Sequence, residues 1–347
     1  MFFCDPFGHT KPENLFNHGK DEWENNYIFF HDQEPILLDI HQPLFDEVAH
    51  RNVDLQHQMG PKHTAFITSE KQSTAVEAAC NMYGWKNYYY FFHGWASLDW
   101  YRGYNHTFLM ALPEQRKITK SFISPNRIVG GYRSHRLLLM YYLLRGGVNN
   151  ALISFPKTCP YENHSVLEMA AKHCEQFPDI ESVFTQAQLP WNFEKESGSP
   201  MHSCWLSLFD EVSQSMAYVV TETIYTGSRL HLTEKVFKPI CQQLPFVLVS
   251  TANSLAYLRE YGFKTFGDFW DESYDSITDD DQRLEKIAQL LLSFDQMSVP
   301  QLQELYQATR PVIEHNYNHF YQGNFEKILW QELTGMLGNI RRDFSAW

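Results

Sequence analysis

The sequence lacks any run of 18 consecutive apolar residues, so it is not expected to contain a membrane-spanning helix. It is also poor in basic residues: 28 Lys and Arg stand against 41 Asp and Glu, which gives a net charge of −13. A general polyanion-binding surface needs clustered cations and is therefore not expected. The first residues carry neither a basic segment nor an apolar core, so no signal peptide and a cytoplasmic location are expected.

Motifs for metals and dinucleotides are missing as well. The six cysteines are scattered and form no C-x-x-C pair, which is typical of reduced thiols and gives no support for a metal site. No G-x-G-x-x-G follows an apparent strand, which disfavours a nicotinamide-dependent oxidoreductase. The acidic stretch 268–281 lacks the glycine and glutamate of an EF-hand loop. We interpret it as a solvated approach to a helix, with Asp279, Asp280 and Asp281 at the helix start.

The chain has enough apolar residues for two sizeable cores. It contains 347 residues, of which 44% are hydrophobic and 16% aromatic. Short apolar runs alternate with helical patterns, which is the α/β pattern. Strands are predicted at 27–30, 65–68, 87–92, 121–123, 151–155, 217–221 and 246–249, and helices at 73–83, 134–144, 282–294, 301–317 and 325–336.

A polar stretch near 113–120 is the best candidate for a domain boundary. It divides the chain into a first domain, 1–115, and a second, 116–324. Trp330, Leu333 and Leu337 share one helix face, so segment 325–347 is predicted to pack back on the first domain.

A basic window within this acidic chain suggests an anion site. Between 115 and 150 there are seven Lys and Arg residues and no Asp or Glu. Asn126 and Arg127 follow a predicted strand, and a Gly-Gly pair precedes the next helix, whose N-terminus favours anions. The residues predicted to bind a phosphate are Arg127, Arg133 and Arg136. The alternative is a solvated basic helix face.

A second motif lies further along the chain. Glu222 follows a predicted strand, and Thr233-Glu234-Lys235 begins a short helix for which Thr233 is the predicted N-cap. At this helix start, Glu234 is predicted to bind two ribose hydroxyls and Lys235 a phosphate. The alternative is that Glu234 only complements the helix dipole and Lys235 is solvated.

Together these segments resemble the donor-binding signature of the alpha-1,3-fucosyltransferase family. The matching positions are Glu222, then Thr233-Glu234-Lys235, then Pro245-Phe246, with the Asn126-Arg127 loop upstream. The resemblance covers about residues 120–265. It implies a GT-B fold, in which two Rossmann-like domains face each other across a cleft, and an inverting reaction without metal or cofactor. Segment 263–275 departs from that family and looks more like glycosyltransferases of large bacterial viruses, which act in the host cytoplasm.

The first half offers residues for proton transfer. His31, Asp32 and Glu34 directly follow a predicted strand, where α/β proteins bind ligands. Glycosyl transfer needs a base for the acceptor hydroxyl, and Glu34 is our first choice, Asp32 the second and His31 a partner. The alternative is a simple turn before Pro35.

An aromatic segment in the same half is predicted to form the rim of an acceptor pocket. Segment 92–102 is predicted to be a loop in which aromatic rings stack on a sugar or base while polar groups bind hydroxyls. The predicted acceptor-binding residues are His93, Trp95, Asp99, Trp100 and Arg102. The alternative is that these aromatics belong to the core.

The sequence therefore predicts an inverting glycosyltransferase that uses a nucleoside-diphosphate sugar. Two acceptors remain possible: a glycan hydroxyl, or a hydroxymethylated base of viral DNA. For the base, the enzyme would have to contact its edge in the duplex or flip it out of the stack. A non-catalytic nucleotide- or carbohydrate-binding protein is the alternative.

Overall fold

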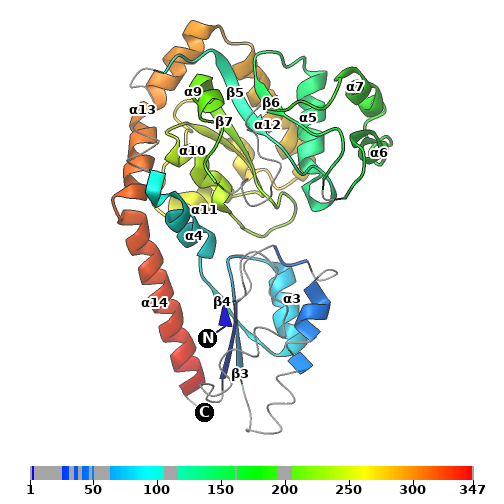
Figure 1. Cartoon of the computed structure of the whole chain (residues 1–347). Coiled ribbons are helices and arrows are strands. Elements are labelled where there is room, and N and C mark those ends of the chain that lie inside the picture. Colours follow the sequence, from blue (N-terminus) through cyan, green and yellow to red (C-terminus); the bar gives the residue numbers. More distant parts are fainter. Residues whose placement is uncertain are drawn as a thin grey trace. The chain divides into compact units, whose positions relative to one another are not determined.

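The computed structural model describes most of the chain. The described residues are 2–3, 26–30, 35–37, 41–46, 49–50, 63–104, 116–160, 162–193 and 205–345. Contacts between residues divide the chain into two units (Figure 1). The first comprises Met1–Trp95, Ser228–His231 and Glu326–Trp347, and the second comprises Ala96–Gly227 and Leu232–Phe325. The predicted boundary was between residues 115 and 116, whereas this division lies between residues 95 and 96. The short segment 228–231 also belongs to the first unit.

The first unit contains a parallel sheet with helices on both faces. Its strands lie in the order β1 (Phe2–Phe3), β2 (Asn26–Phe30), β3 (His63–Thr68) and β4 (Lys86–Tyr89). Successive side chains of β3 point to opposite faces, as the pleat requires. Phe66 packs with Val76 and Ala79 of α3 (Thr74–Tyr83), whereas Ala65 and Ile67 face the other layer.

The C-terminal helix α14 (Asn324–Ser345) supplies that other layer. Met336, Ile340 and Phe344 are buried against β3 and β4. Tyr88 donates its hydroxyl hydrogen bond to Asp343 at 2.7 Å, which ties the helix to the sheet edge. The last described helix thus completes a core whose strands come from the first quarter of the chain.

The second unit contains a second parallel sheet, in the order β6-β5-β7-β8. The strands are β6 (Leu152–Ser154), β5 (Lys120–Pro125), β7 (Ser215–Thr221) and β8 (Phe246–Val249). Every residue of β7 and β8 is buried, because parallel strands are covered on both faces. This burial explains why the strands appear in the sequence as continuous apolar runs.

Helices cover this sheet on both sides. Figure 1 shows α5 (His135–Arg145) and α12 (Asp280–Asp295) on one side of it and α13 (Val299–Tyr321) on the other. The shorter helices of the unit are α6 (Val166–Ala171), α7 (Ile180–Gln186), α9 (Phe209–Gln214), α10 (Phe237–Cys241) and α11 (Ser254–Glu260), and the 3-10 turns are η3 (Gly131–Arg133), η4 (Glu234–Val236) and η5 (Ser273–Ser276).

The predicted α/β class with two parallel-sheet units is confirmed, as is the type of nearly every predicted element. One prediction is wrong: the segment after β4 is helix α4 (Phe92–Tyr101) followed by η1 (Arg102–Tyr104), not an extended loop. Tyr90 and Phe91 remain buried after the strand ends, and a buried apolar run does not reveal where a strand stops. No helix in the described part of the chain is long and apolar enough to cross a bilayer.

Candidate functional site

The strand order places a topological switch point between β5 and β7. The connection from β5 leads outward to β6, and the chain then returns to build β7 on the other side of β5. Ligands of open parallel sheets bind at the carboxyl ends of strands at such a reversal. Asn126 and Glu222 are the first residues after these two strands, so the predicted donor residues lie at the expected place. The described strands of the first unit follow one another in sequence and contain no reversal.

A hydrogen bond joins the ends of the two strands at this point. Thr221 Oγ1 donates to Asn126 Oδ1 at 2.9 Å, and Asn126 Nδ2 donates to Ser124 Oγ at 2.9 Å. Asn126 is buried, and both ends of its amide are engaged. Its side chain therefore fixes the spacing of β5 and β7, which differs from the ligand contact expected for it.

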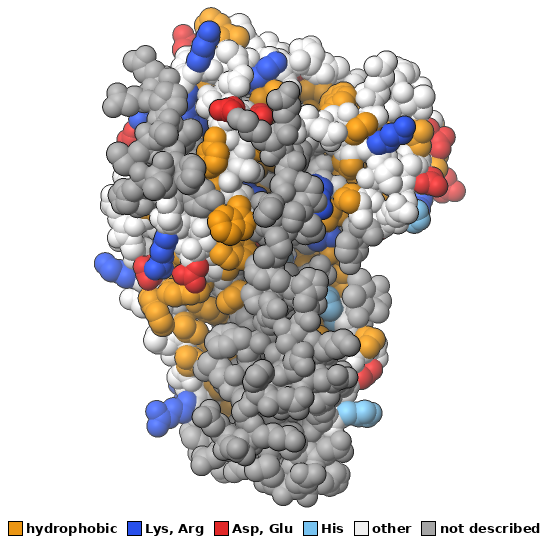
Figure 2. All heavy atoms as spheres, viewed as in Figure 1, with side chains coloured by type: hydrophobic (Ala, Val, Ile, Leu, Met, Phe, Trp, Pro, Cys, Tyr) orange, Lys and Arg blue, Asp and Glu red, His pale blue; other side chains and the backbone are white. Residues whose placement is uncertain are grey.

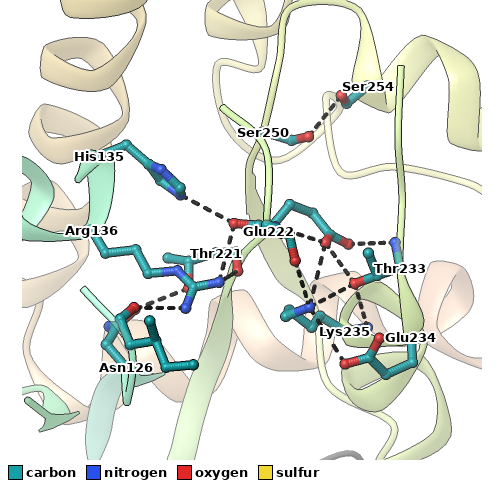
Figure 3. Close-up of polar contacts among 12 residues, drawn as sticks. Asn126, His135, Arg136, Thr221, Glu222, Thr233, Glu234, Lys235, Ser250 and Ser254 are labelled. Carbon is teal, nitrogen blue, oxygen red and sulfur yellow. Dashed lines mark hydrogen bonds and ion pairs between the residues drawn. The ribbon is translucent and has the colours of Figure 1, made fainter. Parts of the chain in front are cut away.

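Arg136 has a structural role that the sequence did not predict. Its guanidinium donates to the carbonyl oxygens of Ile128, Thr221 and Glu222 at 2.9, 2.8 and 3.1 Å (Figure 3). Burial, and after it the charge of Arg133, lowers the pKa of Arg136 to about 9, whereas Glu222 opposes the shift. The charged fork that was expected to bind a phosphate instead holds the loop after β5 against the end of β7.

His135, the residue before it, supports the same strand end. Its ring lies 4.9 Å from that of Tyr225 and nearly parallel to it, and its Nε2 is 3.1 Å from the Glu222 carbonyl oxygen. Burial holds the pKa of His135 well below its usual range, with the Arg136 charge as the next cause. A neutral ring with its proton on Nε2 fits this contact.

Glu222 is completely buried, and its carboxylate accepts hydrogen bonds from neighbouring residues instead of from water. Its Oε1 accepts the Thr233 backbone N–H at 3.0 Å, and its Oε2 accepts the Thr233 hydroxyl at 2.6 Å and the Thr223 backbone N–H at 3.2 Å. Burial raises the pKa of Glu222, while Lys235 and Thr233 partly offset the shift. The predicted donor residue therefore positions the segment that contains Thr233 and Lys235.

The Thr233-Glu234-Lys235 segment has the local structure that was predicted. Thr233 caps η4, since its hydroxyl accepts the Lys235 backbone N–H, so the predicted N-cap is confirmed. The Lys235 ammonium donates to Thr233 Oγ1 at 2.9 Å and to Thr223 Oγ1 at 3.1 Å, and it lies 3.4 Å from Glu234 Oε1. The side chains of Lys235 and Glu234 are 28% and 12% exposed. They are thus the members of this cluster that are partly exposed to solvent.

Arg127 and Arg133 complete the polar edge of this unit. Arg127 is half-buried directly after β5, and Arg133 lies over the Tyr132 ring at 4.3 Å. Neither forms an ion pair with another residue that the structure describes. The charge of Arg133 acts on Arg136, whose pKa it lowers. These two arginines remain candidates for an anionic ligand.

Glu162, which the sequence analysis did not single out, lies against the Gly130-Gly131 turn. A Cβ atom on Gly130 would come within 2.3 Å of Glu162 Oε2, and one on Gly131 within 2.5 Å of Glu162 Oε1. Gly131 also has a φ of 57°, which favours glycine. The turn therefore favours glycine at 131, and a side chain at either position would have to displace the Glu162 carboxylate. The two segments lie far apart in the sequence, so only the tertiary structure reveals this contact.

The predicted acceptor residues do not form one rim. His93, Trp95, Asp99 and Trp100 lie on α4, where a residue turns by about 100°, so Trp95 and Asp99 point away from His93. Trp95 packs edge-on against Trp330 at 4.9 Å, next to the core under α14. Arg102 follows in η1 and is exposed. Trp95 is therefore partly buried against this core.

Contacts between buried polar side chains of the first unit were not predicted, and His231, Arg229 and Glu70 were not singled out. The His93 ring lies 5.2 Å from the His231 ring, at right angles to it, and both are buried. Arg229 pairs with the buried carboxylate of Glu70 at 3.4 Å, and Leu230 bridges to Lys71. Residues 228–231 are far from Glu70 in the sequence, so no local pattern indicated these contacts.

The predicted base lies outside the described residues. This holds for His31, Asp32 and Glu34, which follow β2. Among the residues that are described, no three or more His, Cys, Asp and Glu side chains gather in a way that would hold a metal ion.

Comparisons with known proteins give two solved structures. One is the DNA-modifying enzyme beta-glucosyltransferase, with and without uridine diphosphoglucose, which is 13% identical with a TM-score of 0.42 over 87% of this chain and 74% of that chain. The other is T4 phage BGT with its UDP-glucose substrate, 12% identical with a TM-score of 0.35 over 86% and 73%. No family model and no curated protein matches. The resemblance to alpha-1,3-fucosyltransferases stays a prediction.

Proposed function

We propose that the protein is a glycosyltransferase that takes its sugar from a nucleoside diphosphate. The observation that carries the proposal is the cluster at the β5–β7 switch point. There Glu222 and two threonines hold the Lys235 ammonium beside Glu234. A carboxylate next to cations, on the open edge of a parallel sheet, suits a ribose joined to a diphosphate.

Each group has a role in the proposed reaction. Glu234 accepts hydrogen bonds from the ribose hydroxyls, and Lys235, Arg127 and Arg133 bind the diphosphate. The acceptor oxygen forms a bond to the anomeric carbon as the bond from that carbon to the diphosphate oxygen breaks, with inversion. The cations stabilise the negative charge that develops on the leaving diphosphate, so the proposal includes no resident metal.

The acceptor oxygen loses its proton in this step, and Glu34 is the proposed base. Glu34→Gln keeps the size of the side chain but cannot take a proton, so turnover is expected to fall by about 10²–10⁴-fold. Donor affinity is expected to change little, because the donor residues lie in the other unit. Asp32→Asn is the matched control. If both variants transfer sugar at the unaltered rate, neither carboxylate is the base.

The acceptor is proposed to be a sugar hydroxyl of a glycan or a hydroxymethylated base of DNA. On the described part of the face seen in Figure 2, Lys and Arg are scattered among Asp and Glu and do not form one basic field. The net charge of −13 likewise disfavours broad contacts to phosphates. A DNA acceptor would therefore be bound through a few local contacts with weak salt dependence.

A panel of sugar nucleotides tests the proposal. Thermal-shift binding to sugar derivatives of uridine, guanosine, cytidine and adenosine diphosphate identifies the donor, and mass spectrometry then detects transfer to glycans or hydroxymethylated DNA. Binding together with transfer is expected. Binding without hydrolysis or transfer would identify a non-catalytic nucleotide- or carbohydrate-binding protein, and no binding at all would contradict both functions.

A further inference from the structure

The Lys235 ammonium is surrounded by three partners, as many as it has N–H donors. An ammonium carries three N–H donors. Two of them point to Thr233 Oγ1 at 2.9 Å and Thr223 Oγ1 at 3.1 Å, and the Glu234 carboxylate lies 3.4 Å away for the third (Figure 3). The role predicted for Lys235 therefore requires that one of these partners leaves.

The charges around Lys235 lead to the same requirement. Glu234 Oε1 and Glu222 Oε2 lie 3.4 and 3.9 Å from the ammonium, so one cation faces two carboxyl groups. A diphosphate must therefore compete with the Glu234 carboxylate for the Lys235 charge. The carboxylate and the diphosphate are both negative, and like charges this close together repel strongly where little water intervenes.

Of the two carboxyl groups, that of Glu234 is the more exposed, at 12%. Glu222 is fully buried and accepts three hydrogen bonds, from Thr233 and Thr223. Glu234 is the first residue of η4, and its side chain reaches solvent. Turning its side chain toward a ligand leaves the capped start of η4 intact, because Thr233 and Glu222 hold that start.

We propose that donor binding exchanges this ion pair. The ribose 2′- and 3′-hydroxyls take over Glu234, which frees one Lys235 donor for the diphosphate. The inference rests on the proposed function and defines its substrate class more closely: a ribonucleoside diphosphate with both ribose hydroxyls free. A diphosphate without a ribose meets a Lys235 that Glu234 still occupies, so inorganic pyrophosphate binds weakly.

Calorimetry with two probes tests the exchange. Inorganic pyrophosphate and the ribonucleoside diphosphate that binds best among those of uridine, guanosine, cytidine and adenosine are titrated into the unaltered protein and into Glu234→Gln. The variant is expected to bind pyrophosphate about fivefold more tightly, the upper end for a single ion pair, and to bind the nucleoside diphosphate more weakly. Opposite changes for the two probes are the signature of the exchange.

Two controls assign the gain to Lys235. Glu304→Gln removes the same charge from an exposed position on α13 and is expected to leave both affinities unchanged. Adding Lys235→Ala to Glu234→Gln is expected to abolish the gain for pyrophosphate. A gain that persists in the double variant, or Glu234→Gln binding pyrophosphate no better than the unaltered protein, would overturn the exchange.

A measurement without variants covers the case that Glu234→Gln does not fold. The 2′,3′-dideoxy form of the nucleoside diphosphate is expected to bind the unaltered protein no better than pyrophosphate, and equal affinity of the dideoxy and ribo forms would overturn the exchange. If the unaltered protein binds the nucleoside diphosphate but these results fail, only the exchange is wrong. If it binds none of the four, the proposed function is wrong too.

Discussion

Thr233 is the residue on which the switch-point cluster depends. Its hydroxyl donates to the buried Glu222 carboxylate and accepts from the Lys235 ammonium, while its backbone N–H binds the other Glu222 oxygen. One side chain thus satisfies a buried acceptor and orients a cation. A hydrogen bond to a charged group is worth more than one between neutral groups, because leaving the charge unsatisfied costs its desolvation.

Thr233→Val keeps the shape of this side chain but removes the hydroxyl. The free energy of unfolding is expected to fall by about 1–3 kcal/mol, because Glu222 keeps its burial and loses a donor. Thr233→Ser retains the hydroxyl and is expected to lose much less. Urea denaturation of both variants gives the comparison, and equal stability of the Val and Ser variants would contradict this role.

His135 gives the stability a dependence on pH. Its pKa is held below the usual value of 6.5, chiefly by burial, so the folded state keeps the ring neutral at a pH where the unfolded state protonates it. This contribution is present above about pH 6.5 and is lost as the pH falls below that value. His135→Gln keeps a donor for the Glu222 carbonyl but does not titrate.

The two proteins are therefore expected to differ in their acid response. Below about pH 6, the unaltered protein should lose unfolding free energy faster than His135→Gln, by up to about 1.4 kcal/mol per pH unit. Urea denaturation at several pH values between 5 and 8 measures the difference. Parallel curves for the two proteins would mean that the pKa of His135 is the same in the folded and the unfolded state.

At the scale of elements, acidic side chains fix where several helices begin. Asp279 caps α12, because its carboxylate accepts the Gln282 N–H at 2.8 Å, so the predicted cap is confirmed. The rest of the acidic stretch is less solvated than predicted. Asp275 is buried and accepts the backbone N–H groups of Leu255 and Ala256 at the start of α11. The acidic residues therefore cap two helices of the second unit.

Replacing the cap of α12 tests this assignment. Asp279→Ala is expected to lower the free energy of unfolding by about 0.5–2 kcal/mol, and Asp279→Asn should retain most of it because Asn also caps helices well. Chemical denaturation measures both variants. A full loss with Asn would indicate that charge, rather than the hydrogen bond to Gln282, is what matters.

At the scale of the whole molecule, the two units contain different parts of the proposed reaction. The described donor candidates belong to the second unit, while α14 completes the core of the first. Ile340 is buried under the first sheet, whereas Gln331 on the same helix is exposed. Damage to this core should therefore remain local.

Ile340→Ala is expected to destabilise the first unit by about 2–5 kcal/mol, the range for an aliphatic truncation in a core. Hydrogen exchange followed by mass spectrometry should detect faster exchange in β3 and β4, while β5 and β7 keep their protection. Gln331→Ala is the control. Equal acceleration in both sheets would mean that the units unfold as one.

The sequence by itself determined where the strands and long helices lie, because buried parallel strands read as apolar runs and surface helices as a 3.6-residue pattern. It also placed Thr233 as a cap and put Arg127 and Glu222 at strand ends. Only the tertiary structure decided which charged side chains remain available to bind a ligand. Arg136 and Glu222 look like ligands in sequence, yet carbonyls and N–H groups from other segments bind them. Such partners lie far away along the chain, and only the packing of α5 and η4 against β7 brings them within reach.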